Sequence, residues 1–174
     1  RRADEIREVI TKAFEIASSG KPGPVVIDIT KDAQIGRLDS PAKPPRRVPA
    51  ASLPLPPLHA LAAAARLIDG SQRPLLLIGQ GVLLSRAERE VRLLAERADI
   101  PMISTLLGLS ACPTDHPLYF GMAGMHGNLA PNLLSGEADL IIAVGARFSD
   151  RVTGDRRRYA RAARLIHIDI DPGE

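Results

Sequence analysis

The sequence predicts an α/β protein with a parallel, Rossmann-like sheet and helices on both faces, in three layers. Two observations lead to this prediction. From residue 58 onward, short apolar runs alternate with amphipathic segments, as expected for parallel strands joined by right-handed helical crossovers. Several of these runs are almost continuously apolar, which is typical of strands buried on both faces.

The individual elements of this region follow from local patterns. Ser85 and Glu88 have the spacing of a capping box and predict that a helix begins at Ser85. Pro131 weakens one helical segment, and a long loop is expected between residues 104 and 128. Because the last strand lies close to Glu174, we expect the sheet to lack its final strands. The predicted elements are a helix over 58–69, strands over 74–78 and 100–104, a helix over 85–98, a weak helix over 128–134, and strands over 140–144 and 165–170.

The first 40 residues have a different organisation. Apolar residues between Ile6 and Ala17 recur every three or four positions and predict an amphipathic helix, which Ser19 and Gly20 end. The β-branched run Val25–Ile29 predicts a strand covered on both sides. One helix and one strand do not fold stably alone. We therefore expect this segment to be the end of another domain.

A proline-rich linker separates the two parts. Seven of the 15 prolines fall between Pro41 and Pro57, where missing backbone donors and a fixed φ exclude helix and central strand. Such a segment is extended and fairly stiff. Since 174 residues are too few for two full domains, we expect one domain plus smaller pieces.

Composition excludes several classes of protein. A single cysteine, Cys112, excludes a disulfide framework and a cysteine zinc site, and predicts a reducing, cytoplasmic location. No apolar run is long enough for a membrane helix, and the first residues do not form a signal peptide. Tyr159 is the only aromatic residue among the arginines of residues 156–164, so at a net charge of +3 they indicate a solvated face, not a nucleic-acid site.

In a parallel sheet, the ligand binds beyond the carboxyl ends of the strands. Glycines there let a backbone approach a ligand, arginines bind phosphate, and a carboxylate accepts a ribose hydroxyl. Residues 79–81, 105–108, 145–151 and 169–171 follow predicted strands and together indicate a nucleotide site.

Each of these signals has an alternative interpretation. Gly79 to Gly81 also suit a tight strand-to-helix turn, and Asp169 and Asp171 also suit a helix cap or a solvated loop. His126 lies between glycines, where a lone histidine is more often structural. We recognise no nucleophile, general base or metal site, so no catalytic and no metal-binding residue is predicted.

Four segments stand out together: SGKPGPVVIDITKD at 19–32, TLLGLSACPTDHPLYFGMAGMHG at 105–127, VGARFSDRVTG at 144–154 and HIDIDPGE at 167–174. In this order they resemble the large catalytic subunits of the acetolactate synthase (acetohydroxyacid synthase) family of thiamine-diphosphate enzymes. The second and third segments are the most specific to that family. The resemblance implies that residues 1–35 end a pyrimidine-binding domain, that 36–57 form the linker, and that 58–174 form most of a central, FAD-binding domain.

The resemblance also implies roles for individual residues. Lys31, Met125, Asp150 and Arg151 match positions that line the family's substrate channel. Lys21 stands where the family usually has arginine, and Gln80 replaces the middle of three glycines, so we expect FAD to bind more weakly. The implied FAD contacts are Lys21, Gly79, Gln80, Gly81, Thr105, Leu106, Leu107, Ala123, Gly124, Met125, His126, Gly145, Ala146, Arg147, Asp150, Arg151, Val152, Asp169 and Ile170.

The implied reaction is the condensation of two pyruvates, or of pyruvate and 2-ketobutyrate, with loss of CO2, in branched-chain amino-acid biosynthesis. FAD would be structural, and thiamine diphosphate and Mg2+ would be held outside this segment, which is not active alone. The implied partners are the remaining domains of the same polypeptide, further copies in a homodimer or tetramer, and a regulatory small subunit, with no nucleic acid and no membrane. The alternatives are another thiamine-diphosphate carboligase or decarboxylase, a free-standing nucleotide-binding or regulatory module and, last, a nucleic-acid binder.

Overall fold

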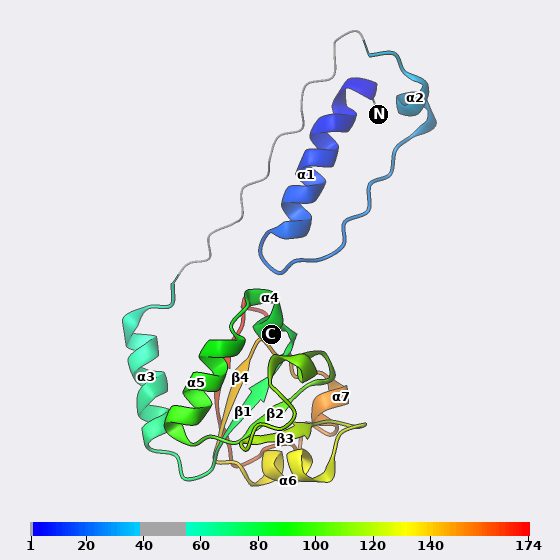
Figure 1. Ribbon diagram of the computed structural model, residues 1–174. Helices are drawn as coiled ribbons and strands as arrows, with labels where there is room; N and C mark the ends of the chain where they lie inside the picture. Colours follow the sequence, from blue (N-terminus) through cyan, green and yellow to red (C-terminus); the bar gives the residue numbers. More distant parts are fainter. Residues whose placement is uncertain (1, 39–54) are drawn as a thin grey trace. The chain divides into compact units, whose positions relative to one another are not determined.

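The computed structural model describes residues 2–38 and 55–174, which belong to two compact units with a boundary between Leu55 and Pro56. Residues 39–54 of the predicted 36–57 linker lie outside the described residues. The first unit contains a short 3-10 helix, η1 (Ala3–Glu5), and two α-helices, α1 (Ile6–Ser18) and α2 (Lys31–Ile35) (Figure 1).

Helix α1 confirms the helix predicted near the start of the chain. Ser19 is its C-cap, and Gly20 follows at a φ of 55°, a left-handed conformation that glycine adopts without strain. The predicted strand Val25–Ile29 is wrong. No strand occurs among the described residues of this unit, and Val26 is 93% exposed. A strand needs a hydrogen-bonding neighbour, and this unit offers none within the described part.

The second unit holds the parallel sheet. Its five strands lie in the order β3-β2-β1-β4-β5, and every neighbouring pair is parallel. The central strand β1 pairs on both sides, with Leu76 opposite Met102 of β2 and Ile142 of β4. The elements are α3 (Leu58–Asp69), β1 (Pro74–Ile78), α4 (Gln80–Ser85), α5 (Glu88–Ala98), β2 (Met102–Ser104), η2 (Leu106–Ala111), β3 (Tyr119–Met122), α6 (Leu129–Glu137), β4 (Leu140–Val144), α7 (Asp150–Thr153) and β5 (Arg164–Ile168).

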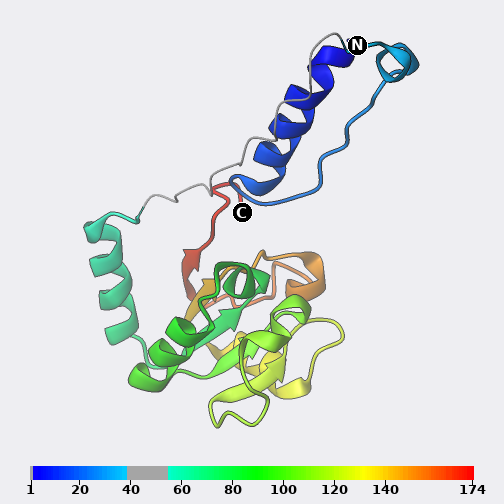
Figure 2. The same cartoon turned by 45° about the horizontal axis from the view of Figure 1, so that its top comes forward.

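Helices cover both faces of the sheet, which confirms the predicted three layers (Figures 1 and 2). Successive residues of β1 point to opposite faces. Leu76 and Ile78 pack with side chains of α3, α4 and α5, whereas Leu75 and Leu77 pack with side chains of α6 and α7. All four are at most 2% exposed, as expected for a central parallel strand. Within the described residues, no helix combines the length and the apolar character of a membrane span.

Three local predictions need correction. Ser85 does not begin a helix: it ends α4, where its hydroxyl donates to the carbonyl of Gly81, and α5 begins only at Glu88. The left-handed Arg86 separates the two helices. The expected long loop after residue 104 contains η2 and β3. Pro131 does not interrupt α6, because it lies in the first turn, where a backbone N–H has no intrahelical partner.

Candidate functional site

All five strands end at the same edge of the sheet, because they are parallel. Four of the predicted groups follow β1, β2, β4 and β5 directly, as the sequence indicated. The fifth group, Ala123 to His126, follows β3, a strand that the sequence analysis missed. The structure thus places residues of the predicted nucleotide site after every strand of the sheet.

The centre of this edge is the point where the strand order reverses. Strand β1 leads into α4 on one face of the sheet, whereas β4 leads toward α7 on the other face. Val82 of α4 belongs to the apolar core on the first face, and Val152 of α7 packs against the core on the second. Such a reversal of strand order is the usual ligand position in open α/β sheets. Gly79, Gly81 and Gly145 lie there.

These glycines contact one another. The N–H of Gly81 donates to the carbonyl of Gly145 at 2.9 Å, and the N–H of Gly79 donates to that of Val144 at 2.9 Å. A Cβ on Gly81 would lie 2.5 Å from the Cα of Gly145, which is too close for any side chain. The approach of the two turns therefore explains why both residues are glycine, and the tight-turn interpretation holds for this position.

The segment Ala123–Gly127 is held from three sides. The N–H of Ala123 donates to the carbonyl of Ser104 in β2 at 2.9 Å, and the N–H of Met125 donates to that of Arg151 in α7 at 2.8 Å. On the third side, the backbone of Gly124 hydrogen-bonds with the side chain of Asn132 in α6. The two segments with the most specific motifs, 105–127 and 144–154, therefore meet at Met125 and Arg151.

The predicted residues expose both apolar and charged side chains. Leu106, Leu107 and Met125 are 66%, 59% and 60% exposed, although apolar side chains of this size are commonly buried. Gln80, His126, Arg147, Asp150, Arg151 and Ile170 are exposed as well, while Thr105 and Val152 are half-buried and Ala123, Gly124 and Ala146 are buried. Asp150 forms a 3.7 Å ion pair with Arg151. The edge thus offers apolar surface beside cationic groups.

At the end of β5, Asp169 provides a carboxylate that is only 14% exposed. Its Oδ1 accepts the N–H of Asp171 at 2.9 Å, and its Oδ2 lies 3.9 Å from Nε2 of His167. Nε2 of His167 lies 3.0 Å from the carbonyl of Ala146, and the ring packs edge-on against Phe148. His167 therefore links the end of β5 to the turn after β4 and limits the positions that Asp169 can take.

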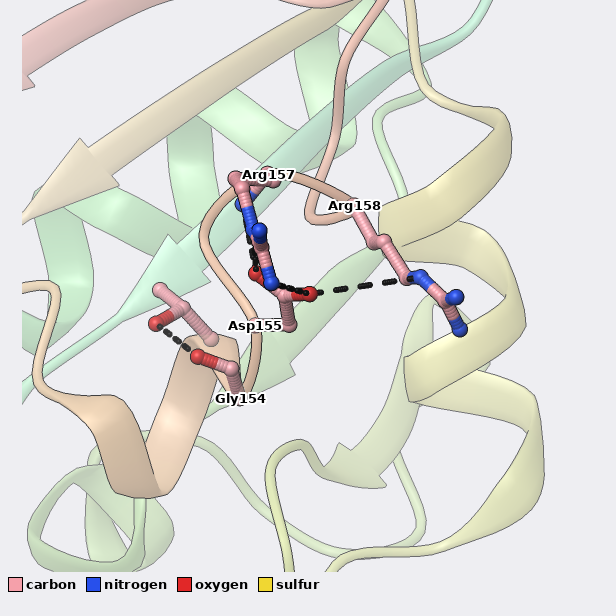
Figure 3. A network of polar contacts seen from close by, with 5 residues as sticks. Gly154, Asp155, Arg157 and Arg158 are labelled. Atoms are coloured by element: carbon pink, nitrogen blue, oxygen red, sulfur yellow. Dashed lines mark hydrogen bonds and ion pairs between the residues drawn. The ribbon is translucent and has the colours of Figure 1, made fainter.

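The basic segment after α7 pairs internally (Figure 3). Asp155 accepts hydrogen bonds from the backbone N–H and the guanidinium of Arg157, and lies 4.0 Å from the guanidinium of Arg158. The hydrogen bonds from Arg157 lower the pKa of Asp155. Both arginine side chains are 88% exposed, which fits the solvated face that the sequence predicted.

Two predicted residues, Lys21 and Lys31, lie in the first unit. Lys21 is exposed and is the third residue after the end of α1, and Lys31 is the exposed first residue of α2. In the described parts of the two units, no group of three or more His, Cys, Asp or Glu side chains is arranged to hold a metal ion.

Asn132 is the residue of this region that the sequence analysis missed. Its amide binds the backbone of Gly124, eight residues earlier in the chain. A signal was present, because an asparagine side chain within a helix commonly bonds to backbone. The backbone that it contacts could only be identified from the tertiary structure.

The amino-acid sequence that forms this edge, together with the rest of the chain, is similar to known proteins. A family model described as "Thiamine pyrophosphate enzyme, central domain" matches residues 61–174. The chain is 48% identical to the probable acetolactate synthase large subunit of Methanocaldococcus jannaschii, over 100% of the chain and 30% of that protein. It is 42% identical to the acetolactate synthase isozyme 1 large subunit of Escherichia coli, over 100% of the chain and 30% of that protein. It is 43% identical to the chloroplastic acetolactate synthase 1 of Zea mays, over 98% of the chain and 27% of that protein.

Proposed function

Since the chain belongs to the thiamine pyrophosphate enzyme family through its central domain, we propose that it is the FAD-binding central part of an acetolactate synthase large subunit. The observation that carries this proposal is the junction of Met125 and Arg151, which brings the two most specific motifs together at the carboxyl edge of the sheet. The relatives named acetolactate synthase support it, with identities of 40% to 48%.

The residues present at this edge fit the chemistry of FAD. The exposed side chains of Leu106, Leu107 and Met125 suit the faces of flat aromatic rings, and Arg147 offers a guanidinium to a diphosphate. Asp169, a half-buried carboxylate after β5, suits a ribose hydroxyl. When bound, FAD would supply a rigid structural element and no net redox step.

Family membership implies thiamine diphosphate and Mg2+ in the whole enzyme. The chain spans about 30% of the length of the curated relatives it matches. We assign to the whole enzyme the condensation of two pyruvates, or of pyruvate and 2-ketobutyrate, with loss of CO2. In the second unit, Met125, Asp150 and Arg151 would line the path of the substrate.

The proposed partners follow from the same assignment. The enzyme would be a homodimer or tetramer that works in the cytoplasm with a regulatory small subunit. Residues 1–35 would end its pyrimidine-binding domain and 58–174 would form most of its central domain.

The test is flavin binding by the protein expressed from its natural reading frame and purified with excess FAD. We expect stoichiometric flavin absorbance after gel filtration, and acetolactate formation from pyruvate. Protein that stays free of flavin would contradict the FAD assignment. Preference for glyoxylate over pyruvate would instead indicate another thiamine-diphosphate carboligase.

A matched pair of variants localises the FAD site. Gln80→Gly removes an exposed side chain at the first position of α4, beside the switch point of the sheet. We expect it to tighten FAD binding, because a backbone without a side chain can approach a ligand more closely. Gln72→Gly makes the same change before β1, at the opposite edge of the sheet, and should leave the affinity unchanged. Equal effects of the two variants would count against a site at Gln80.

A further inference from the structure

Asn132 makes two hydrogen bonds with a single residue. Its Oδ1 accepts the backbone N–H of Gly124 at 2.8 Å, and its Nδ2 donates to the carbonyl of Gly124 at 3.0 Å. One amide side chain therefore satisfies both polar backbone groups of a buried glycine. Among the side chains found in proteins, only the primary amides of asparagine and glutamine offer such an acceptor and donor pair in a single plane.

Gly124 needs this support because of its conformation. Its φ is 100°, a region that L side chains rarely adopt, and a Cβ there would lie 2.5 Å from the carbonyl oxygen of Arg151. The backbone at Gly124 therefore cannot form the regular ladder of a strand or helix. Asn132 supplies the hydrogen bonds that a ladder would otherwise provide.

The next two residues are those that the proposed site uses. Met125 is 60% exposed and His126 is exposed, while Gly124 itself is buried. The N–H of Gly127 returns to the carbonyl of Gly124 at 2.9 Å, so Gly124 fixes both ends of the turn that presents these side chains. A rotation of the peptide at Gly124 would move Met125 and His126 together.

We propose that Asn132 is a positioning residue that, through Gly124, holds Met125 and His126 in place for the ligand. The inference rests on the proposed function, because it assigns the ligand of this turn to the acetolactate synthase site. Asn132 itself acts through the backbone and need not touch substrate or FAD.

Two substitutions at Asn132 remove its hydrogen bonds to Gly124 to different extents. Asn132→Asp keeps an acceptor for the N–H of Gly124 but places a second oxygen against its carbonyl, and Asn132→Leu removes both hydrogen bonds. The same substitutions at Asn128 are the controls, because Asn128 is exposed like Asn132 and lies on the N-cap of the same helix, but makes no side-chain capping bond.

The experiment measures two quantities in the protein expressed from its natural reading frame. The first is the hydrogen exchange rate of the Gly124 amide, and the second is the separate KM and kcat for pyruvate. We expect Asn132→Leu to speed the exchange roughly three- to tenfold, the factor for the one hydrogen bond that the N–H of Gly124 loses. We expect Asn132→Asp to raise KM by a similar factor and Asn132→Leu, which loses two hydrogen bonds, to raise it further. We expect kcat to change less than KM, and the Asn128 variants to match the wild type.

The outcomes separate the inference from the proposed function. Faster exchange with KM unchanged would mean that Asn132 is merely structural, and an unchanged exchange rate in Asn132→Leu would overturn the inference directly. If the wild-type protein neither binds FAD nor uses pyruvate, the proposed function fails and the ligand role of Asn132 fails with it. The exchange rates would then still show whether Asn132 holds Gly124.

Discussion

The N–H of Gly81 donates a 2.9 Å hydrogen bond to the carbonyl of Gly145, so the turns after β1 and β4 touch along their backbones. Neither position has room for a Cβ: one on Gly81 would lie 2.5 Å from Gly145, and one on Gly145 would lie 2.4 Å from Gly81. The two turns at the strand reversal thus meet at two glycines, and both the fold and the proposed site depend on them.

Gly81→Ala should destabilise the protein. The added methyl group must displace backbone, not a flexible side chain, and overpacking of this kind costs about 1–3 kcal/mol. Urea unfolding measures the loss. The control is Gly136→Ala in α6, where nothing lies within 4 Å of the new Cβ. That change should stabilise by about 0.5–1 kcal/mol, because alanine is the better helix former. Changes of the same sign in both variants would contradict the packing explanation.

The Asp139→Asn variant should lose stability in a way that depends on pH. The carboxylate of Asp139 accepts the backbone N–H groups of Gln72 at 2.7 Å and Arg73 at 3.0 Å, which lower its pKa below the ordinary 3.8. The stabilisation is therefore complete above the ordinary pKa and is lost as the pH falls through the lower folded value.

Thermal unfolding at several pH values measures this effect. The Asp139→Asn variant should be less stable than the wild type at neutral pH, and this difference in the free energy of unfolding should shrink toward zero in strong acid. Asp69→Asn, on the exposed end of α3, is the control for the loss of a surface charge, and at neutral pH it should lower the stability less than Asp139→Asn does. A deficit that stays constant with pH would show that the charge of Asp139 is irrelevant.

Cys112 should be unreactive in the folded protein. Its side chain is buried, with the residue 4% exposed, and burial raises the pKa of the thiol, so the reactive thiolate is scarce. Alkylation by iodoacetamide, followed by mass spectrometry, should be slower in buffer than in urea by about 10³-fold or more, as a native state stabilised by about 5 kcal/mol implies. Rapid labelling in buffer would mean that η2 opens readily.

Tyr119→Phe should destabilise the pairing of β2 and β3. The tyrosine hydroxyl lies 2.7 Å from Oγ of Ser104, a residue that is 0% exposed. The substitution leaves the buried hydroxyl of Ser104 without its hydrogen-bond partner, at a cost of about 1–3 kcal/mol. The double variant with Ser104→Ala removes both polar groups and should recover most of the loss. A double variant less stable than Tyr119→Phe would show that the hydrogen bond is not the cause.

The sequence predicted the centre of the sheet better than its margins. Strands β1 and β4 were found because buried parallel strands are continuous apolar runs. Strand β3, with the sequence YFGM, was missed because it is short, half-buried and contains a glycine. The strand expected at Val25–Ile29 failed because a β-branched run forms a strand only beside another strand.

The candidate site also has a part that the sequence predicts and a part that only the structure shows. Residues that follow strands could be predicted, since parallel strands place their carboxyl ends together. Gly81 was interpreted as room for a ligand or as a tight turn, and only the structure shows that Gly145 fills the space. The hydrogen bonds between Asn132 and Gly124 are tertiary contacts that no periodicity reports.

The strand order also determines the sequence in which the sheet can assemble during synthesis. Strand β1 emerges from the ribosome before both of its neighbours, and Ile142, opposite Leu76, is made long after it. Until β4 arrives, the apolar run Leu75–Ile78 has an open hydrogen-bonding edge on that side, which is a condition that favours aggregation of nascent chains. Closure of the β1–β4 pair spans a long stretch of chain, so this step should limit the folding rate and make the nascent chain dependent on chaperones.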